Sequence, residues 1–337
     1  MALNCTGPIS IGGCTTGQSI AKELGLTTTA QHSLNCTSYR TLSGQASGAV
    51  SMNAFHGKSN VVKGSATFTA VGCGSWIVPA GVTSVSALVV ASGGSGGTGY
   101  VGCCCGSSYS IAGPGGAGGG LAYTNNISVT PGATIYYKVG SYATRCTTWF
   151  KCSCLVAAYA GCSGCQGSCP GRGTHGSVQT NGGHGGSGAL SPTGGALTGY
   201  GGGGGGAAGY SGNGGNGMNG CGGSGTCGSG GGGGGGGAKV GSVGGGAGGG
   251  GIGLFGQGSS GAKGTVGGGG GGGGSSGSNG SAGPSGVGQL GGHGGNYGGG
   301  SGGSTGGAGK TNYSNAAIRI IWPGNTRQWP STCTGTP

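Results

Sequence analysis

The chain has 337 residues, of which 105 are glycine and only 4% are charged, and its formal net charge is +12. Glu23 is the only acidic residue, which excludes paired-carboxylate hydrolysis, a Ser-His-Asp triad and carboxylate sites for Ca²⁺ or Mg²⁺. The basic residues are dispersed, without the clusters that are typical of nucleic-acid binding. We therefore expect no enzyme, no nucleic-acid partner, no cofactor and no metal.

The net charge has two interpretations, which are long-range attraction to anionic surfaces such as bacterial envelope polysaccharide and simple solubility without carboxylates. The 16 cysteines are an even number, which is typical of a disulfide framework in an oxidising location. The start, MALNCTGPIS, lacks the regions of a signal peptide, and no segment reaches the roughly 18 apolar residues of a membrane span. Together these features favour a protein released by cell lysis, such as a virion component, without membrane insertion.

Residues 1–60 predict two short helices. A cap at Ser19 or Thr16 predicts a first helix that ends at Gly25, and the stretch SLNCTSYRTLSG predicts a second. Neither helix is long enough to be stable alone. We expect them to pack on each other or on a partner protein.

Residues 61–180 contain short runs of β-branched and aromatic residues, such as SVSALVVA and TIYYKV, separated by turn-forming residues. This spacing predicts a small antiparallel β-sandwich. Its long loops, including GGSGGTGYVGCCCGSSYS, are expected to be held by disulfides, because ordering them is otherwise costly.

Most of the cysteines lie beyond residue 60, and their pairing is open; the candidates for disulfides are Cys73, Cys103, Cys104, Cys105, Cys146, Cys152, Cys154, Cys162, Cys165, Cys169, Cys221 and Cys227. The stretch CSCLVAAYAGCSGCQGSC, at 152–169, also contains a C-x-x-C spacing that would suit a tetrahedral metal site. Because no second well-spaced C-x-x-C is present, disulfides are the preferred interpretation and a metal site is the alternative.

Residues 181–311 are rich in glycine, and collagen is excluded because the glycines follow no strict G-X-Y period. A disordered linker is one alternative. The other is a lattice of polyglycine-II helices, which have three residues per turn and hydrogen-bond only to their neighbours. Glycine runs at 201–206, 230–237, 244–251 and 267–274 alternate with bulkier segments, and this pattern favours the lattice. Any Cβ would push adjacent helices apart.

Residues 312–337 return to ordinary complexity. The run AAIRIIW predicts a strand that ends at Pro323 and pairs back into the β domain. The expected fold is mainly β. It consists of a small N-terminal helical module, a disulfide-stapled antiparallel β-sandwich, and a polyglycine-II helix lattice closed by a C-terminal strand.

The stretch from ISIGGCTTGQSIAKELGLTTTAQHSLN to YRTLSGQASGAVSMNAFHGKS resembles an N-terminal module of tail-associated structural proteins of tailed bacteriophages. Met52, Phe55, Gly57 and Lys58 match the end of that module, whereas His56 replaces the usual Tyr. The resemblance implies that residues 1–60 attach the protein to the virion, with other tail or baseplate proteins as partners.

Two further stretches resemble phage proteins. AIRIIWPGNTRQWPSTCT is similar to the C-terminal ends of virion proteins of aquatic and cyanobacterial phages, and SWIVPAGVTSVSALVVASGGSGG looks like the β domains of phage fibres. In composition alone, the glycine region resembles the polyglycine-helix adhesins of T-even-type long tail fibres. That resemblance implies a lattice that binds a host receptor, either polysaccharide or outer-membrane protein, through the turns between its rods.

No residue-level motif carries over for the receptor site, so its contacts are predicted from chemistry. Bulky or aromatic residues in exposed glycine turns are good candidates, because aromatics supply much recognition energy. The candidates are Tyr200, Tyr210, Asn213, Asn216, Met218, Leu254, Phe255, His293, Asn296 and Tyr297. The alternative is that these residues plug the ends of the lattice.

We expect a non-enzymatic tail-fibre or tail-tip protein, located in the virion and extracellular after host lysis. One alternative is a purely architectural virion component, and a remote one is an ice-binding glycine-rich protein, against which the irregular turns speak. A Cys/His enzyme is the weakest alternative. Phage fibres are commonly trimers and adhesin tips are also single chains, so a homotrimer and a monomer both stay open.

Overall fold

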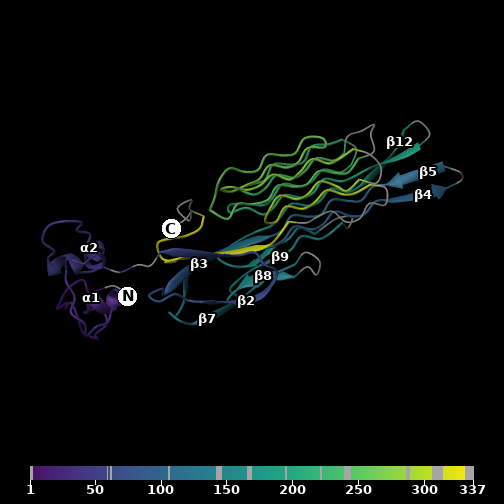
Figure 1. The fold of residues 1–337 in the computed structure, drawn as a ribbon. Helices are drawn as coiled ribbons and strands as arrows, with labels where there is room; N and C mark the ends of the chain where they lie inside the picture. The colour runs from purple at the N-terminus through teal and green to yellow at the C-terminus, as the bar shows by residue number, and fades with distance from the viewer. Residues whose placement is uncertain are drawn as a thin grey trace.

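A computed structural model of the chain describes residues 3–58, 60, 63–104, 107–141, 146–164, 169–193, 196–220, 222–238, 244–285, 289–305 and 314–330, without the side chains of 100–110 and 190–198. Three parts follow one another along the molecule (Figure 1). A small helical module lies at the N-terminal end, β-strands form the middle, and glycine-rich segments extend away from the module to the far end.

The N-terminal module contains the short α-helices α1 (Ile20–Glu23) and α2 (Thr37–Ser43) and the 3-10 helix η1 (Met52–Phe55). The side chain of Ser19 caps the start of α1, and Gly44 ends α2 in the left-handed conformation that glycine adopts without strain. The module has its own small core, formed by Leu3, Ile20, Tyr39, Leu42 and Phe55. Both predicted helices are confirmed.

Two antiparallel five-stranded sheets form the middle of the molecule, with strand orders β1-β14-β3-β6-β11 and β10-β9-β8-β7-β2. The strands of the first sheet are β1 (Gly64–Phe68), β3 (Ser84–Val90), β6 (Leu121–Ser128), β11 (Val178–Thr180) and β14 (Ala317–Trp322). Those of the second are β2 (Gly72–Ile77), β7 (Thr134–Val139), β8 (Thr147–Phe150), β9 (Val156–Tyr159) and β10 (Gly173–His175).

The two sheets share one hydrophobic core. Val89 and Ile320 of the first sheet and Phe150 of the second are completely buried in it. The ring centroids of Trp76 in β2 and Trp322 in β14 lie 5.4 Å apart across the sheets. Alternating burial along β2 is typical of a strand with one face on a core and the other in solvent. The prediction of packed antiparallel sheets is therefore confirmed.

The C-terminal strand β14 lies between β1 and β3 and is antiparallel to both, with Ile320 opposite Ala66 and Ala87. All residues of β14 are buried. The chain reaches this central position only after it has passed through the glycine-rich region. The predicted return of a final strand to the β domain is confirmed.

The glycine-rich segments run side by side and are joined by backbone hydrogen bonds; we call this bonded set the glycine-rich array. Along 201–209, the N–H donors turn to a different neighbouring segment at each successive residue, and the pattern repeats every three residues, with distances of 2.7–3.2 Å. The donors and their acceptor segments are Gly201, Gly204 and Ala207 with 244–250; Gly202, Gly205 and Ala208 with 113–119; and Gly203, Gly206 and Gly209 with 212–218.

The glycine-rich array begins well before residue 181. The segments 91–97 and 113–120, which directly follow β3 and precede β6, belong to it, since Gly94 N–H donates to Ala117 O and Gly116 N–H donates to Ser301 O, both at 2.8 Å. A Cβ on Gly116 would overlap the carbonyl of Gly94, so only glycine allows this approach. The expected boundary at 181 is wrong, because the strands of the sandwich run on into the array.

A third sheet lies at the far end of the molecule (Figure 1). Its strands are β4 (Tyr100–Cys104), β5 (Ser107–Ile111), β12 (Ala189–Thr193) and β13 (Ala196–Tyr200), in the order β12-β13-β5-β4. The expected disulfide-held loop after β3 therefore consists of an array segment followed by the hairpin of β4 and β5.

Disulfide stapling is seen at one place in the described part of the chain. Cys152 and Cys154 form a disulfide, but it closes a loop too small to hold distant segments together. Among the candidates, Cys73, Cys169 and Cys227 form no disulfide, so the expected framework is wrong for these three; Cys5, Cys14 and Cys36 of the N-terminal module form none either. Cys146 is half-buried and Cys162 is buried. Cys105, Cys165 and Cys221 and the side chains of Cys103 and Cys104 lie outside the description.

Candidate functional site

The structure divides the predicted receptor contacts into buried and exposed residues. Tyr200, Tyr210 and Leu254 are buried, with at most 4% of each residue exposed. The prediction that they lie exposed in turns is therefore wrong. Tyr297 is half-buried and packs against the cluster that contains Tyr210 and Leu254. Trp329, near the C-terminal end of the described chain, joins the same cluster.

Tyr210 shows what these buried residues do. Its ring stacks on Trp329 at a centroid distance of 5.7 Å, and its hydroxyl donates to Gly253 O at 2.8 Å. The outer face of the first sheet contributes Leu88 and Leu121 to the same cluster. Tyr210, Leu254 and Tyr297 thus pack the glycine-rich array against the first sheet. Burial raises the pKa of the Tyr210 hydroxyl, so this group stays protonated there.

Phe255 is partly exposed, at 38%. The guanidinium carbon of Arg319 lies 4.1 Å from the centroid of its ring, which is cation–π geometry. Arg319 belongs to β14 and is only 3% exposed, so Phe255 covers a buried charge. Burial lowers the pKa of Arg319. The contact gives Phe255 a structural role at the border between array and sheet.

Exposed polar side chains form a regular row on the surface of the array. Asn213, Asn216 and Asn219 are exposed and follow one another at intervals of three residues; we call them the asparagine row. Each side-chain Oδ1 accepts a hydrogen bond from a backbone N–H of the neighbouring segment 181–187. The donors are Asn181 at 3.0 Å, His184 at 2.9 Å and Ser187 at 2.8 Å, in the same order.

The two segments are also joined through their backbones. Gly214, Gly217 and Gly220 donate to the carbonyls of Asn181, His184 and Ser187, at 2.8–2.9 Å. The side chains of the asparagine row therefore supply acceptors for N–H groups that no backbone carbonyl meets at this edge. On the other side, Thr226 N–H donates to Asn216 O at 2.9 Å, which places the segment 225–228 next to the row.

Two members of the asparagine row, Asn213 and Asn216, were predicted contacts, whereas Asn219 and the paired His184 were missed. A signal for them is present in the sequence, because NGGHGGSG at 181–188 and NGGNGMNG at 213–220 repeat a polar residue every three positions. The expectation of no strict G-X-Y period holds for the region as a whole but hides these local periods. Met218, also exposed, lies within this segment.

His293 and Asn296 form a second exposed pair at three-residue spacing. The backbone N–H of His293 donates to Ser281 Oγ at 2.6 Å, and that of Asn296 donates to Ser278 Oγ. Here a serine hydroxyl supplies the acceptor that an asparagine amide supplies in the asparagine row. Short polar side chains thus complete the hydrogen bonding of the array at its surface.

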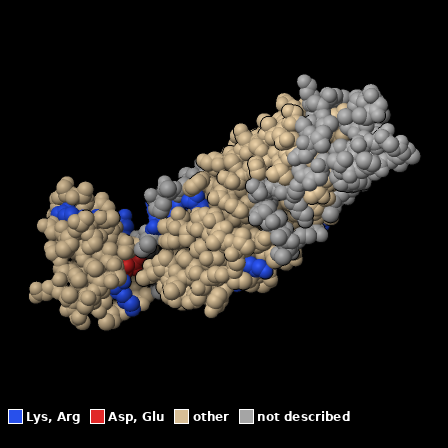
Figure 2. Space-filling view, turned by 45° about the vertical axis from the view of Figure 1, so that its right-hand side comes forward, with Lys and Arg blue, Asp and Glu red and all other residues tan. Residues whose placement is uncertain are grey.

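The surface of the molecule carries separated Lys and Arg side chains on a largely uncharged background (Figure 2). The single acidic residue, Glu23, belongs to α1 of the N-terminal module. No carboxylate side chain is therefore present in the sandwich or in the array. An anionic ligand meets no fixed side-chain charge of its own sign on these two parts.

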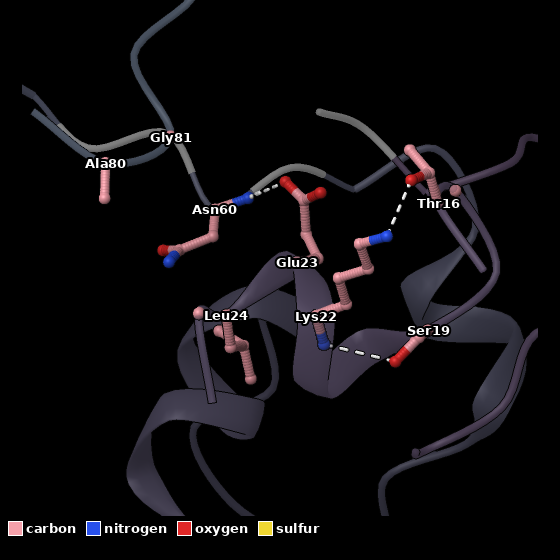
Figure 3. Close-up of a pocket in the computed structure, with 10 residues that line it drawn as sticks. Thr16, Ser19, Lys22, Glu23, Leu24, Asn60, Ala80 and Gly81 are labelled. Carbon is pink, nitrogen blue, oxygen red and sulfur yellow. Dashed lines mark hydrogen bonds between the residues drawn. The ribbon is translucent and has the colours of Figure 1, made fainter. Parts of the chain in front are cut away.

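A cavity of about 380 Å³ lies at the junction of the N-terminal module and the sandwich (Figure 3). It is lined by Lys22, Glu23 and Asn60 on one side and by Ala80 on the other. Glu23 Oε1 accepts from Asn60 N–H at 2.9 Å, and Lys22 Nζ donates to Thr16 Oγ1 at 2.9 Å. Its two charged side chains are thus hydrogen-bonded to the protein itself, which indicates a joint between two parts.

The predicted attachment residues have structural contacts within the module. Phe55 is completely buried and Met52 packs against the same core. Gly57 has a left-handed φ of 69°, and its N–H donates to Asn4 O at 3.1 Å. The exposed Lys58 pairs through its carbonyl with Leu3 N–H. These contacts close the module on itself.

Within the described ranges, no three His, Cys, Asp or Glu side chains lie close enough together to hold a metal ion. No helix of the described part combines the length and the apolar character that crossing a membrane requires. No protein-family model and no curated protein sequence matches this chain at a significant level.

Proposed function

We propose that the chain is a structural protein of a phage tail fibre or tail tip, which attaches to the virion through its N-terminal module and adsorbs to the host cell surface through its glycine-rich array. One observation carries the proposal: the module that resembles phage attachment modules and the array occupy opposite ends of the molecule (Figure 1). The partners are then other tail or baseplate proteins at one end and a host receptor at the other.

In this proposal the segments of the array are polyglycine-II helices. The support is the change of hydrogen-bond partner at each residue with a period of three, because a helix with three residues per turn directs successive N–H groups to three neighbours. A β-strand would alternate between two neighbours. Many glycines inside the array have no room for a Cβ, as Gly204 illustrates with its close approach to the carbonyl of Gly300.

The exposed polar rows on the array supply candidate receptor contacts in place of the buried Tyr200, Tyr210 and Leu254. They lie on ordered backbone and therefore lose little conformational freedom when a ligand binds.

The test is binding of the purified, fluorescently labelled full chain to intact candidate host cells, with competition against infection by the phage. Saturable binding that blocks phage adsorption is the expected result. A chain that is found in virions but binds no host cell would instead be an architectural spacer, and a chain absent from virions would overturn the proposed location.

A further inference from the structure

We infer that the asparagine row is a binding site for an extended polysaccharide that carries carboxylate groups. The inference rests on the proposed function, since it names the class of receptor that the array contacts. It starts from the direction of three amide groups. A backbone N–H is a donor only, so the atom that faces Asn181, His184 and Ser187 in each row amide is the oxygen.

The amide nitrogens consequently point away from those backbone donors. Among the described residues, the Nδ2 groups of Asn213, Asn216 and Asn219 donate no hydrogen bond. All three residues are exposed, so each offers two N–H donors to a ligand. Three residues of extended backbone span about 9–10 Å, so these donors repeat at a fixed interval along one direction.

Beyond the two segments that adjoin the row, the next segment on each side carries an exposed basic residue. Arg172 pairs with Asn181 in an isolated antiparallel bridge on one side. On the other side, Gly225 N–H donates to Gly264 O at 2.9 Å, which brings the segment of the exposed Lys263 next to 225–228. The surface around the row thus combines a line of amide donors with a positive charge one segment further out on each side and no carboxylate.

This chemistry fits a ligand that is rich in acceptors, anionic and periodic. Carboxylate oxygens form stronger hydrogen bonds with N–H donors than neutral oxygens do. A polysaccharide repeats its acidic groups along the chain, so several weak contacts act together. Single-stranded nucleic acid fits less well, because the segments 181–187, 212–220, 225–228 and 261–264 contain no Phe, Tyr or Trp on which successive bases would stack.

The test compares two triple variants of the full chain. Asn213→Asp, Asn216→Asp and Asn219→Asp keep an oxygen that accepts the backbone N–H, but they remove the outward donors and add three negative charges. The control variant, Asn35→Asp, Asn53→Asp and Asn279→Asp, changes three other exposed asparagines and makes the same change in net charge. Matching thermal unfolding of both variants and the wild type checks that the array is intact.

Affinity is measured for polygalacturonate, alginate and hyaluronate, with dextran as the uncharged polymer. We expect saturable binding of at least one of the acidic polymers, weak or no binding of dextran, and a loss of at least tenfold in the row variant alone. Equal losses in both variants would show that only net charge matters and would overturn the site. Binding of dextran as tight as that of the acidic polymers, or no binding of any of these, would overturn the ligand class.

The cell assay separates this inference from the proposed function. Binding to host cells without binding to acidic polysaccharide contradicts the inference alone. Binding to acidic polysaccharide through the row, without binding to any host cell, contradicts the proposed adsorption alone.

Discussion

At the scale of single residues, the glycines of the array differ in whether the surrounding backbone leaves room for one methyl group. A Cβ on Gly204 would collide with the carbonyl of Gly300, whereas a Cβ on Gly244 would meet Pro284 O at 3.0 Å, a tight but tolerable distance. Both positions lie in the array and neither has a left-handed φ. The difference between them is therefore one of packing against a neighbouring backbone, which has no side chain to move aside.

We expect Gly204→Ala to lower the free energy of unfolding by about 3 kcal/mol or more, since relief of the overlap would require two backbone segments to separate. Gly244→Ala is the matched control. Its loss should be smaller by at least about 1.5 kcal/mol, because any strain is offset by the reduced freedom of the unfolded chain. Urea unfolding followed by circular dichroism measures both. Equal losses of unfolding free energy would show that the backbone segments around Gly204 separate at little cost.

The burial of Tyr210 predicts that the free energy of unfolding depends on pH above neutrality. Burial is the main cause that raises its pKa above the ordinary value of 10.0, while the Gly256 N–H and Arg319 act in the opposite direction. The unfolded chain releases this proton near pH 10 and the folded chain keeps it. The stabilising contribution is therefore complete below pH 10 and is lost as pH rises above it.

We expect the free energy of unfolding to fall above pH 10 by up to about 1.4 kcal/mol per pH unit for such a tyrosine. Tyr210→Phe removes this group and should make the decline shallower, while it loses about 1 kcal/mol at neutral pH with the hydrogen bond to Gly253. Tyr136→Phe, at a residue 65% exposed, should leave both unchanged. Unfolding curves at pH 8, 10 and 11 test this expectation. The same decline of the free energy of unfolding with pH in the wild type and in both variants would contradict the assignment of the decline to Tyr210.

At the scale of elements, β14 connects the sandwich with the end of the array. It occupies a central place in the first sheet, and its Ile320 is completely buried in the core between the sheets. Arg319, on the same strand, lies against Phe255 of the array. Because successive side chains of a strand point to opposite faces, β14 packs against the second sheet on one side and against the array on the other.

Ile320→Ala should lower the free energy of unfolding by about 2–5 kcal/mol, the usual loss for removing a buried side chain of this size. The control is Ile77→Ala in β2, where the side chain is 65% exposed and the loss should stay below about 0.5 kcal/mol. Hydrogen exchange should show faster exchange in 201–209 as well as in β3. Faster exchange confined to the sandwich would mean that the array is stable without β14.

At the scale of the whole molecule, the N-terminal module has its own core and meets the sandwich at the cavity that contains Glu23. The hydrogen bond from Asn60 N–H to Glu23 Oε1 bridges the module and the segment that leads into β1. If the protein attaches and adsorbs as we propose, this joint sets the direction of the array relative to the virion.

Glu23→Ala should loosen the joint and increase the radius of gyration and the maximum dimension measured by small-angle X-ray scattering. Glu23→Gln keeps an oxygen that accepts the N–H of Asn60 and should leave both close to the wild type. A change with Gln as large as that with Ala would assign the joint to the charge of Glu23 instead of its hydrogen bond.

The sequence predicted the parts of the fold that rest on local patterns. Short runs rich in β-branched residues, such as SVSALVVA, identified strands, and a cap at Ser19 or Thr16 identified a helix start, which the structure places at Ser19. It predicted the boundary of the array wrongly, because the glycines at 93–97 and 113–120 read as loops between strands. It also assigned Tyr210 and Leu254 to exposed turns, since no local pattern shows which turn faces a sheet.

Composition and order along the chain by themselves predicted that this protein is mainly β, that a long glycine-rich region separates its strand-forming runs, and that its final strand pairs with the earlier ones. Only the tertiary structure decided which residues are at the surface. In the array each segment completes its hydrogen bonds on several neighbours that are distant in sequence. The exposure of a residue therefore depends on where those neighbouring segments end. In the asparagine row, a side-chain oxygen accepts the hydrogen bond that a backbone carbonyl accepts elsewhere in the array.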